Sequence, residues 1–439
     1  MCIGFLILQN MDLQELYALY LQYPLVNTDT RKELKGSIFF CLKGPNFDAN
    51  TFADEALSKG AAHVVSDSVE NNGKDKITVV ADVLLTLQKL ASLHRKNFTF
   101  PVIGLTGSNG KTTNKELIAA VLATKYKTYH TKGNLNNHIG VPLTLLSIPL
   151  SAEMAVIEMG ANHQGEIRDL CAISDPDYGM ITNFGKAHLE GFGGVEGVIK
   201  GKKELYNHLN NKNGIVFVNG DDALLSEHSA NLNRVLFGKK SSDYFVEGII
   251  VESAPIISFQ FSTADKSSPI INTLLVGSYN FYNLLAACCI GTYFKVEPEN
   301  IAKALEEYTP TNNRSQLIKT EKNEIILDAY NANPSSMEAA IENLYAQKHT
   351  SKYALLGEML ELGITSKDEH QLLIDNLEAK NIHALLVGNG FKLCDKKSFH
   401  WFENTIDLND YLKENTISNS LVLVKGSRAV AMEKIVDFL

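Results

Sequence analysis

The segment of residues 102–113, Val-Ile-Gly-Leu-Thr-Gly-Ser-Asn-Gly-Lys-Thr-Thr, constrains the fold more than any other part of the chain. An apolar run leads into a turn with two glycines, and a helix-like run follows Lys111. In such a strand–turn–helix unit, backbone N–H groups of the turn and the N-terminus of the helix bind phosphate. Lys111 can reach the β- and γ-phosphates, and the Thr112 hydroxyl can bind Mg²⁺. The segment therefore predicts a nucleotide-binding α/β domain.

The spacing departs from the strict P-loop at one position. That pattern requires a glycine five residues before Gly110, and Leu105 stands there. An ordinary glycine-rich turn with a solvated lysine is the alternative. Because strand, turn, lysine, threonine and helix follow in the required order, the pattern favours nucleotide binding.

The composition restricts the class of protein. A chain of 439 residues exceeds what one hydrophobic core usually organises. The net charge of −9 argues against a broad nucleic-acid or anionic-membrane surface, and no apolar run approaches the ~20 residues of a membrane span. The scattered cysteines are expected to be buried, reduced thiols of a cytoplasmic protein. They are Cys2, Cys41, Cys171, Cys288, Cys289 and Cys394. We expect residues 1–10 to be an upstream extension, and an amphipathic helix begins near Met11.

Alternating apolar and amphipathic runs predict three α/β domains: residues 1–98, 99–310 and 311–439. In the central domain, expected strands at 102–105, 154–157, 178–182 and 214–218 alternate with helices and imply a mainly parallel sheet. Short β-runs between about 234 and 275 suggest an antiparallel appendage. The last domain alternates again, with strands expected at 324–328, 353–357, 384–388 and 421–425.

Polar residues follow several of these strands. Glu158, Asp328, Glu358 and Lys425 stand at expected strand ends, where ligands of open α/β sheets gather. A partly buried carboxylate there needs a metal, a basic partner or helix N–H groups. A structural salt bridge or a helix cap is the alternative for any one of them. Together with a phosphate loop, they favour a nucleotide and metal site.

Two further positions have ordinary interpretations. The lysine cluster around Lys202 lies in an amphipathic helical pattern and, taken alone, predicts a solvated face. Asn280 and Asn283 stand at a helix start and by default would be capping residues.

Several segments together resemble the Mur ligase family of cell-wall enzymes, whose phosphate loop reads Thr-Gly-Ser-Asn-Gly-Lys-Thr-Thr as it does here. The resemblance runs from about residue 25 to the C-terminus. The matching segments are Gly133–Leu143, Glu158–Asn162, Ile181–Phe192, Asp328–Met337, Leu356–Gly363 with His370, and Val424–Ala429. The resemblance implies an N-terminal UDP-sugar domain, a central P-loop-like ATPase domain with a parallel sheet, and a C-terminal Rossmann-like domain.

The resemblance also implies roles for individual residues. ATP phosphates would be held by Gly107, Ser108, Asn109, Gly110, Lys111, Thr112 and Thr113, and the rest of the nucleotide by Asn280, Arg314 and Asp328. Thr112, Glu158 and His188 would bind Mg²⁺, together with Lys202 if it is carbamylated, and the catalytic set would be Lys111, Glu158, His188 and Lys202. The substrates would be contacted by Thr30, Arg31, Asn331, Asn333 and Glu358. Thr30 replaces a serine of the family pattern, and Asn50 stands where a histidine is common.

The expected function is ATP-dependent ligation of D-alanyl-D-alanine to UDP-N-acetylmuramoyl-tripeptide through an acyl phosphate, by a protein that is a monomer. The segments at 328–337 and 356–363 favour this member of the family. Another amide ligase of the superfamily, of the folylpolyglutamate or cyanophycin type, is the alternative among enzymes. From a different class, the chain could be an ATP-driven switch that forms no new bond.

Overall fold

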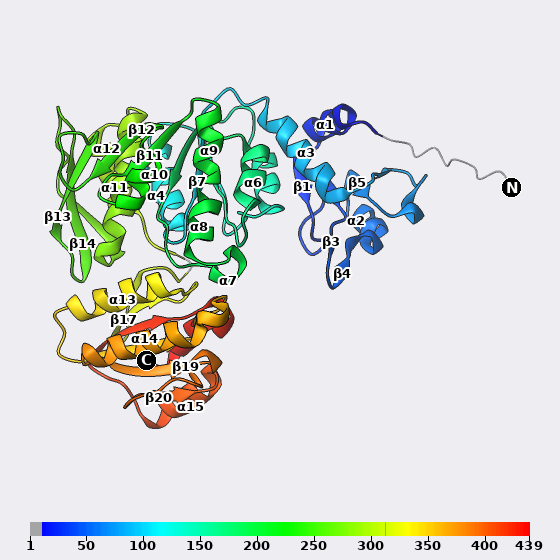
Figure 1. Cartoon of the computed structure of the whole chain (residues 1–439). Helices are drawn as coiled ribbons and strands as arrows, with labels where there is room; N and C mark the ends of the chain where they lie inside the picture. Colours follow the sequence, from blue (N-terminus) through cyan, green and yellow to red (C-terminus); the bar gives the residue numbers. More distant parts are fainter. Residues whose placement is uncertain (1–10, 312) are drawn as a thin grey trace. The chain divides into compact units, whose positions relative to one another are not determined.

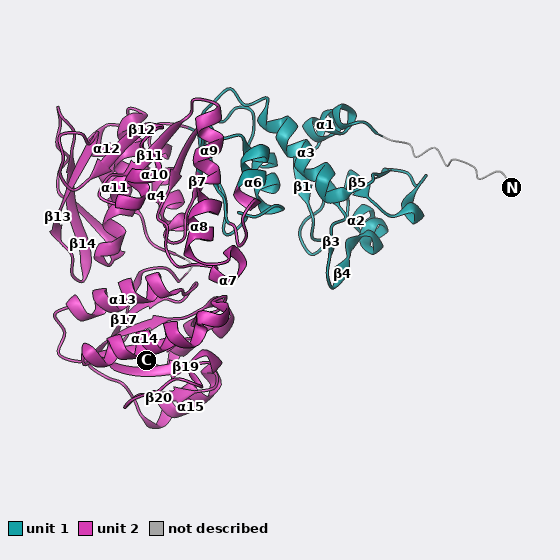
Figure 2. Ribbon diagram, viewed as in Figure 1, with its two compact units in different colours: residues 1–104, 127–160, 168–177 teal, residues 105–126, 161–167, 178–439 magenta. Residues whose placement is uncertain are grey.

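The computed structural model describes residues 11–311 and 313–439 (Figure 1). The expected upstream extension, residues 1–10, lies outside the described residues. The chain divides into two compact units, coloured separately in Figure 2. Unit 1 comprises residues 1–104, 127–160 and 168–177, and unit 2 comprises residues 105–126, 161–167 and 178–439. The boundaries of the three expected domains stay a prediction.

Unit 1 contains a four-stranded parallel sheet with the order β1-β2-β5-β6, and separately the parallel pair β8 and β9. Its elements are α1 (Leu13–Gln22), β1 (Leu25–Asn27), β2 (Ser37–Phe40), β3 (Lys43–Gly44), β4 (Phe47–Asp48), α2 (Ala53–Ser58), β5 (His63–Ser66), β6 (Ile77–Val79), α3 (Val83–Arg95), β8 (Thr128–His130), α5 (Gly140–Leu146) and β9 (Met154–Glu158). β7 (Val102–Thr106) and α6 (Glu166–Ser174) begin in one unit and end in the other.

The predicted amphipathic helix near Met11 is α1. Asp12 and Glu15 form a reciprocal capping box at its start, which satisfies two backbone donors. Its buried face packs on α3, where the hydroxyls of Tyr17 and Tyr20 contact the two ring nitrogens of His94 at 3.2 and 3.3 Å. The apolar face of α1 is therefore anchored by both packing and hydrogen bonds.

Unit 2 contains the other parallel strands and a second complete sheet. Its elements are α4 (Lys111–Ala123), β10 (Tyr178–Ile181), α7 (Leu189–Phe192), α8 (Val195–Lys202), α9 (Glu204–Asn211), β11 (Ile215–Asn219), α10 (Ala223–His228), β12 (Asn233–Gly238), β13 (Val246–Glu252), β14 (Ile256–Ser262), β15 (Ile271–Val276), α11 (Phe281–Tyr293), α12 (Pro298–Glu307), β16 (Gln316–Lys319), β17 (Asn323–Asp328), α13 (Pro334–Ala346), β18 (Lys352–Gly357), α14 (Ser366–Ala379), β19 (His383–Val387), β20 (His400–Phe402), α15 (Thr405–Glu414) and β21 (Ser420–Lys425).

Strands β10 to β13 pair in parallel, and β13, β14 and β15 pair antiparallel. The predicted antiparallel appendage is thus confirmed for β14 and β15 but wrong for β12, which pairs parallel with β11 and with β13. Val216, Phe217 and Val218 are consecutive and all buried, so helices cover both faces of the sheet at β11. Helices α9 and α10 pack on β11, as does α11, which also contacts α4.

The C-terminal sheet has the order β16-β17-β21-β18-β19-β20, parallel except for β16. All six residues of β21 are buried, as expected of a central strand covered on both faces. Helix α13 packs against α14, and α15 packs against the 3₁₀ helix Met432–Phe438. In the described part of the chain, no helix is both long and apolar enough to cross a membrane.

Candidate active site

The phosphate loop adopts a conformation that depends on its two glycines. Gly107 has φ +146° and Gly110 has φ +76°, a region that side chains with a Cβ disfavour. A Cβ on Gly107 would also collide with the Thr182 side chain. Helix α4 begins at Lys111, whose ammonium donates to the carbonyl of Gly107 at 2.8 Å. The strand–turn–helix prediction is confirmed as a structure, with the lysine folded over the loop.

A second loop, residues 182–188, supports the phosphate loop. The Thr182 hydroxyl donates to the Asn109 carbonyl at 2.6 Å, and the Asn109 N–H donates to Oδ1 of Asn183 at 3.1 Å. The Ser108 hydroxyl donates to the Gly185 carbonyl at 2.8 Å. These contacts fix the backbone before any ligand binds, which lowers the conformational cost of holding an anion. Thr112 and Thr113, at the start of α4, are both buried.

Asn280 does not cap α11, although its position predicted a capping residue. Its side-chain amide donates to the Val276 carbonyl at 2.8 Å and to the Ser315 hydroxyl at 3.2 Å. Asn283 in turn donates to Oδ1 of Asn280 at 2.8 Å, and Asn114 donates to Oδ1 of Asn283 at 2.6 Å. A chain of amides thus connects Asn280 to the helix that follows the phosphate loop.

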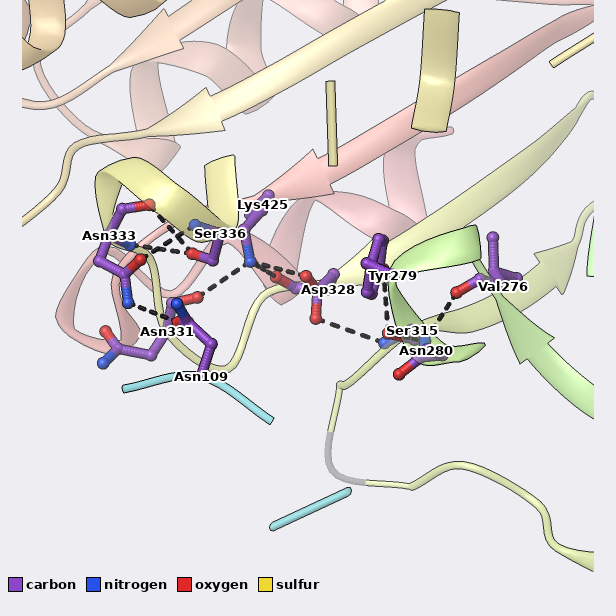
Figure 3. A network of polar contacts seen from close by, with 10 residues as sticks. All are labelled: Asn109, Val276, Tyr279, Asn280, Ser315, Asp328, Asn331, Asn333, Ser336 and Lys425. Carbon is purple, nitrogen blue, oxygen red and sulfur yellow. Dashed lines mark hydrogen bonds and ion pairs between the residues drawn. The ribbon is translucent and has the colours of Figure 1, made fainter. Parts of the chain in front are cut away.

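Asp328 has the basic partner that its position at a strand end required. The Lys425 ammonium donates to Oδ2 of Asp328 at 2.6 Å and to the Asn331 carbonyl at 3.1 Å (Figure 3). Only 3% of the Lys425 side chain is exposed, so this is a buried ion pair. The Ser315 N–H donates to Oδ1 of Asp328 at 3.3 Å, and the Ser315 hydroxyl contacts Asn280. Asp328 and Asn280, both expected at the nucleotide, therefore belong to one network.

Two guanidinium groups flank one tyrosine ring beside this network. The Cζ atom of Arg314 lies 3.6 Å from the ring centroid of Tyr330, and that of Arg428 lies 5.2 Å from it. The Arg314 Nε is buried and has no hydrogen-bond partner among the described residues. A buried N–H without a partner is costly unless a ligand satisfies it, so this donor suits an anion. The nucleotide role of Arg314 stays a prediction.

Asn333 lies against the phosphate loop. Its side-chain amide donates to Oδ1 of Asn109 at 2.7 Å, while its own Oδ1 accepts the Ser336 N–H at 2.9 Å and caps α13 (Figure 3). The neighbouring Ser335 hydroxyl accepts the Lys186 N–H at 3.0 Å. The start of α13 therefore contacts both the phosphate loop and the loop of residues 182–188. A substrate role for Asn333 stays a prediction.

The two other expected substrate residues, Glu358 and Asn331, make hydrogen bonds within residues 313–439. Oε2 of Glu358 accepts the Gly390 N–H at 2.7 Å, and the Asn331 carbonyl accepts from Lys425. Their predicted contacts with substrate are not tested by these bonds.

His188 and Lys202 also lie in unit 2. The Nδ1 atom of His188 contacts Oε2 of Glu361. Burial lowers the pKa of His188, an effect that the Glu361 carboxylate opposes. Lys202 is fully buried; it donates to the Ala161 carbonyl at 3.2 Å and lies 4.9 Å from the ring centroid of Phe192. The solvated-face interpretation of its cluster is wrong for Lys202, because this side of α8 faces the protein interior. Burial holds the pKa of Lys202 well below its usual value, and the Lys111 charge adds to this effect.

Glu158 and the expected sugar-site residues belong to unit 1. Glu158 is buried, and its Oε1 accepts from the side chain of Asn136 at 2.8 Å. Arg31 is held by Asp29 through two side-chain bonds of 2.9 and 2.7 Å, while the Thr30 carbonyl accepts from Lys59 at 3.0 Å. The Arg31 side chain is 87% exposed and so is accessible to a ligand.

Asn50, which replaces a common histidine, has a structural role. Its Oδ1 accepts from the Ser66 hydroxyl at 2.6 Å, and its amide donates to Asp48 and Asp67, both at 2.7 Å. The buried side chain therefore fixes the 3₁₀ turn before α2 to the end of β5.

The donors expected for Mg²⁺ are few. No group of three or more His, Cys, Asp or Glu side chains suited to a metal occurs among residues 11–311 and 313–439. Mg²⁺ commonly takes only one or two protein ligands and completes its shell with phosphate oxygens and water. The Thr112 hydroxyl beside the phosphate loop and the partly buried His188 ring fit such a nucleotide-borne ion. The predicted Mg²⁺ role of Glu158, which lies in unit 1, stays a prediction.

These features define an α/β protein with a phosphate loop to which a C-terminal parallel sheet adds polar side chains. The Mur ligase middle domain family matches residues 105–291, and the Mur ligase, glutamate ligase domain family matches residues 313–428. The UDP-N-acetylmuramoyl-tripeptide–D-alanyl-D-alanine ligase of Bacillus subtilis is 36% identical over 430 residues, which cover 94% of this chain and 92% of that protein. The chain belongs to the Mur ligase family.

Solved structures agree with this family and with the predicted α/β fold class. The crystal structure of MurF from Acinetobacter baumannii is 32% identical and covers 94% of this chain and 92% of that one, with a TM-score of 0.83. The MurF ligase of Thermotoga maritima in complex with ADP is 28% identical and covers 95% and 97%, with a TM-score of 0.84.

Two contacts at this site involve residues with no predicted role: Lys186 with Ser335, and Glu361 with His188. Each of these residues stands inside a segment that carried the family resemblance. Their place in segments that follow apolar strands was the available signal. Their partners lie far away in sequence, so the sequence could not indicate the pairing.

Proposed function

We propose that the chain is an ATP-dependent ligase that joins D-alanyl-D-alanine to UDP-N-acetylmuramoyl-tripeptide and releases ADP and phosphate. Relatives 31–36% identical over most of the chain carry the name of that ligase. The single observation that carries the proposal is the contact of Asn333 with Asn109, which brings the C-terminal part to the phosphate loop. A ligase must hold ATP and an acceptor at one place, and this contact joins the two parts.

In the proposed reaction the terminal carboxylate of the tripeptide attacks the γ-phosphorus of ATP. An acyl phosphate forms and ADP leaves. The amine of D-alanyl-D-alanine then attacks the acyl carbon, and phosphate leaves. An anion attacking a polyphosphate needs positive charge, which we assign to Lys111 and to the N–H groups of residues 107–113. Alignment of three substrates can itself contribute ~7–11 kcal/mol to lowering such a barrier.

We assign the nucleotide to residues of unit 2. Gly107 to Thr113 would hold its phosphates, with Asn280 on the adenine side. Arg314 and Asp328 would contact it from the C-terminal part. The buried Nε of Arg314 supports this assignment, since a phosphate or ribose oxygen would satisfy it.

We assign Mg²⁺ to Thr112, Glu158, His188 and a carbamylated Lys202. When bound, the ion would neutralise the phosphate charge. Lys202 supports the modification because its amine is fully buried and contacts a carbonyl and an aromatic ring, with the pKa well below the usual value. The neutral amine is the form that adds CO₂. Carbon-13 NMR after exposure to labelled CO₂ should show a carbamate signal in the wild type and none in Lys202→Arg. The same spectrum for both proteins would contradict the modification.

The other substrates would bind at the expected positions. Thr30 and Arg31 would contact the UDP group within residues 1–98. Asn331, Asn333 and Glu358 would contact the growing peptide and the dipeptide within residues 311–439, with residues 99–310 as the ATPase domain. The product is a building block of peptidoglycan. We accordingly place the protein in the cytoplasm, as a monomer whose product serves cell shape and division.

Mass spectrometry of the reaction products tests the proposal. Purified protein is incubated with ATP, Mg²⁺, UDP-N-acetylmuramoyl-tripeptide and D-alanyl-D-alanine, and each substrate is left out in turn. We expect the pentapeptide product and stoichiometric phosphate only in the complete mixture. Product from glutamate and a folate, or from an arginine and aspartate polymer, would favour the alternative ligases. Slow phosphate release without any acceptor would favour the switch.

A further inference from the structure

The loop between β18 and α14, residues 358–365, contacts the loop of residues 182–188, which supports the phosphate loop. Oε2 of Glu361 meets Nδ1 of His188. Both residues have positive φ, +63° for Glu361 and +53° for His188. This left-handed conformation costs free energy for any residue with a Cβ, and it persists where surrounding contacts require it. Two such residues facing one another indicate a contact that the fold maintains at a cost.

The backbone of the loop also docks on α7. The Glu190 N–H donates to the Glu361 carbonyl at 3.3 Å. Gly363 has φ +56°, and a Cβ there would lie 3.3 Å from Cβ of Glu190. The approach is therefore close over several residues and not confined to one pair of side chains.

The base of the loop is fixed by α14 and by the loop that follows β21. Nε2 of the buried His370 accepts the Met359 N–H at 3.0 Å, and its Nδ1 contacts the Ser366 carbonyl at 2.6 Å. The Ser427 hydroxyl accepts the Leu360 N–H at 3.0 Å. The Glu361 carboxylate is thus presented from a rigid base that belongs to the C-terminal part.

A carboxylate on one ring nitrogen of a metal-binding histidine has a known physical effect. It fixes the tautomer and the ring orientation, and it makes the other nitrogen a better ligand. At His188, Oε2 of Glu361 contacts Nδ1 without the geometry of a hydrogen bond. A carboxylate at this position can only accept, so we infer that it favours the Nδ1–H tautomer, which leaves the lone pair on Nε2. The contact comes from a part of the chain far from the phosphate loop in sequence.

We propose that Glu361 is a positioning residue: it holds the Nδ1–H of His188 and thereby presents Nε2 to the metal of the nucleotide site. The inference rests on the proposed function for the identity of that metal. It goes further because the ligand becomes properly oriented only when the 358–365 loop is docked on α7. The C-terminal part thus contributes to metal binding without supplying a ligand.

The test compares Glu361→Ala and Glu361→Gln with the wild type and with Glu342→Gln. Glu342 pairs with Lys380 on the surface of the same part and serves as the control. Nitrogen-15 NMR of the metal-free protein reports the His188 tautomer, with the signal assigned by its loss in His188→Gln. Electron paramagnetic resonance measures the affinity for Mn²⁺ in the presence of ADP.

We expect the Nδ1–H tautomer in the wild type, in the control and in Glu361→Gln, whose amide oxygen still accepts. In Glu361→Ala we expect mixed tautomers and Mn²⁺ affinity lower by about tenfold or more, the usual range for removing such a partner. Unchanged tautomer and affinity in Glu361→Ala would overturn the inference. Neither measurement requires the protein to form a peptide bond. A wild type that makes no pentapeptide would therefore refute the proposed function alone, whereas an unaffected Glu361→Ala would refute only the positioning role.

Discussion

The side-chain amide of Asn333 donates a hydrogen bond of 2.7 Å to the side-chain oxygen of Asn109. Asn333 begins α13 in the C-terminal part, and Asn109 lies in the phosphate loop of the central part. The other side-chain atom of Asn333 caps its own helix by accepting the Ser336 N–H. One residue thus has two separable tasks, and a substitution can remove one and keep the other.

Asn333→Asp should keep the cap and lose the link. Aspartate caps a helix as well as asparagine does, but it cannot donate to Oδ1 of Asn109. We expect unchanged thermal stability and a kcat about fivefold lower, the kinetic equivalent of about 1 kcal/mol for one hydrogen bond. Asn404→Asp is the control for kcat, because Asn404 also caps a helix with its side-chain oxygen but donates its amide within the same turn, to Asp407. Equal kcat for Asn333→Asp and the control would contradict the link.

Lys111→Ala should remove activity and leave the fold intact. The ammonium is the side-chain charge of the phosphate loop, and loss of one such stabilising donor typically costs 10²–10³ in kcat. Lys125→Ala, in the turn that follows α4, is the control, since its exposed ammonium contacts the Lys295 carbonyl. The measurement is steady-state phosphate release, with circular dichroism as the check on folding. A Lys111→Ala variant with near wild-type turnover would refute the phosphate assignment.

Lys425→Met should destabilise the C-terminal sheet. It leaves the Asp328 carboxylate without the ammonium 2.6 Å away, and breaking a buried pair on one side typically costs about 3–5 kcal/mol. The double variant Lys425→Met with Asp328→Leu should recover much of the loss, because no unpaired charge remains. Lys413→Met breaks the exposed pair with Asp410 and should cost less than about 1 kcal/mol. Urea unfolding measures all three. A single variant as stable as the wild type would exclude a structural role for the pair.

Stability should fall on mild acidification. Burial lowers the pKa of His63, His94 and His370 below the ordinary 6.5. Below pH 6.5 these histidines bind protons in the unfolded chain but stay neutral in the folded protein. The free energy of unfolding therefore decreases as the pH falls from 6.5 toward the folded pKa values. Urea unfolding at pH 7.5 and pH 5.5 tests this, and His370→Gln should show a smaller decrease. Equal stability at both pH values would contradict it.

The phosphate loop could be predicted because its determinants are contiguous in the sequence. The glycines, Lys111 and the following helix act within one strand–turn–helix unit, and the left-handed backbone at Gly110 needs no distant partner. Helix α1 and most of the parallel strands could be predicted for the same reason. In strands such as β7 and β21, the buried residues form continuous apolar runs.

The rest depends on contacts between distant segments. Lys202 resembles a solvated lysine in the sequence, yet its side chain is buried and contacts Phe192 and the Ala161 carbonyl. Asn280 stands at a cap position, yet Val276 and Ser315 take its amide. The short, partly polar run of β12 does not indicate which strand it pairs with, so its sequence does not distinguish it from the antiparallel strands that follow. The contact between Glu361 and His188 could not be predicted, because nothing in the sequence around either residue indicates the other.

An oxygen-18 experiment tests whether the tripeptide carboxylate attacks ATP, because that attack transfers a carboxylate oxygen to the released phosphate. UDP-N-acetylmuramoyl-tripeptide labelled with oxygen-18 in its terminal carboxylate is converted with ATP and D-alanyl-D-alanine, and the released phosphate is analysed by mass spectrometry. If the carboxylate attacks the γ-phosphorus, each phosphate carries one labelled oxygen. Pentapeptide formed together with unlabelled phosphate would contradict the acyl-phosphate route.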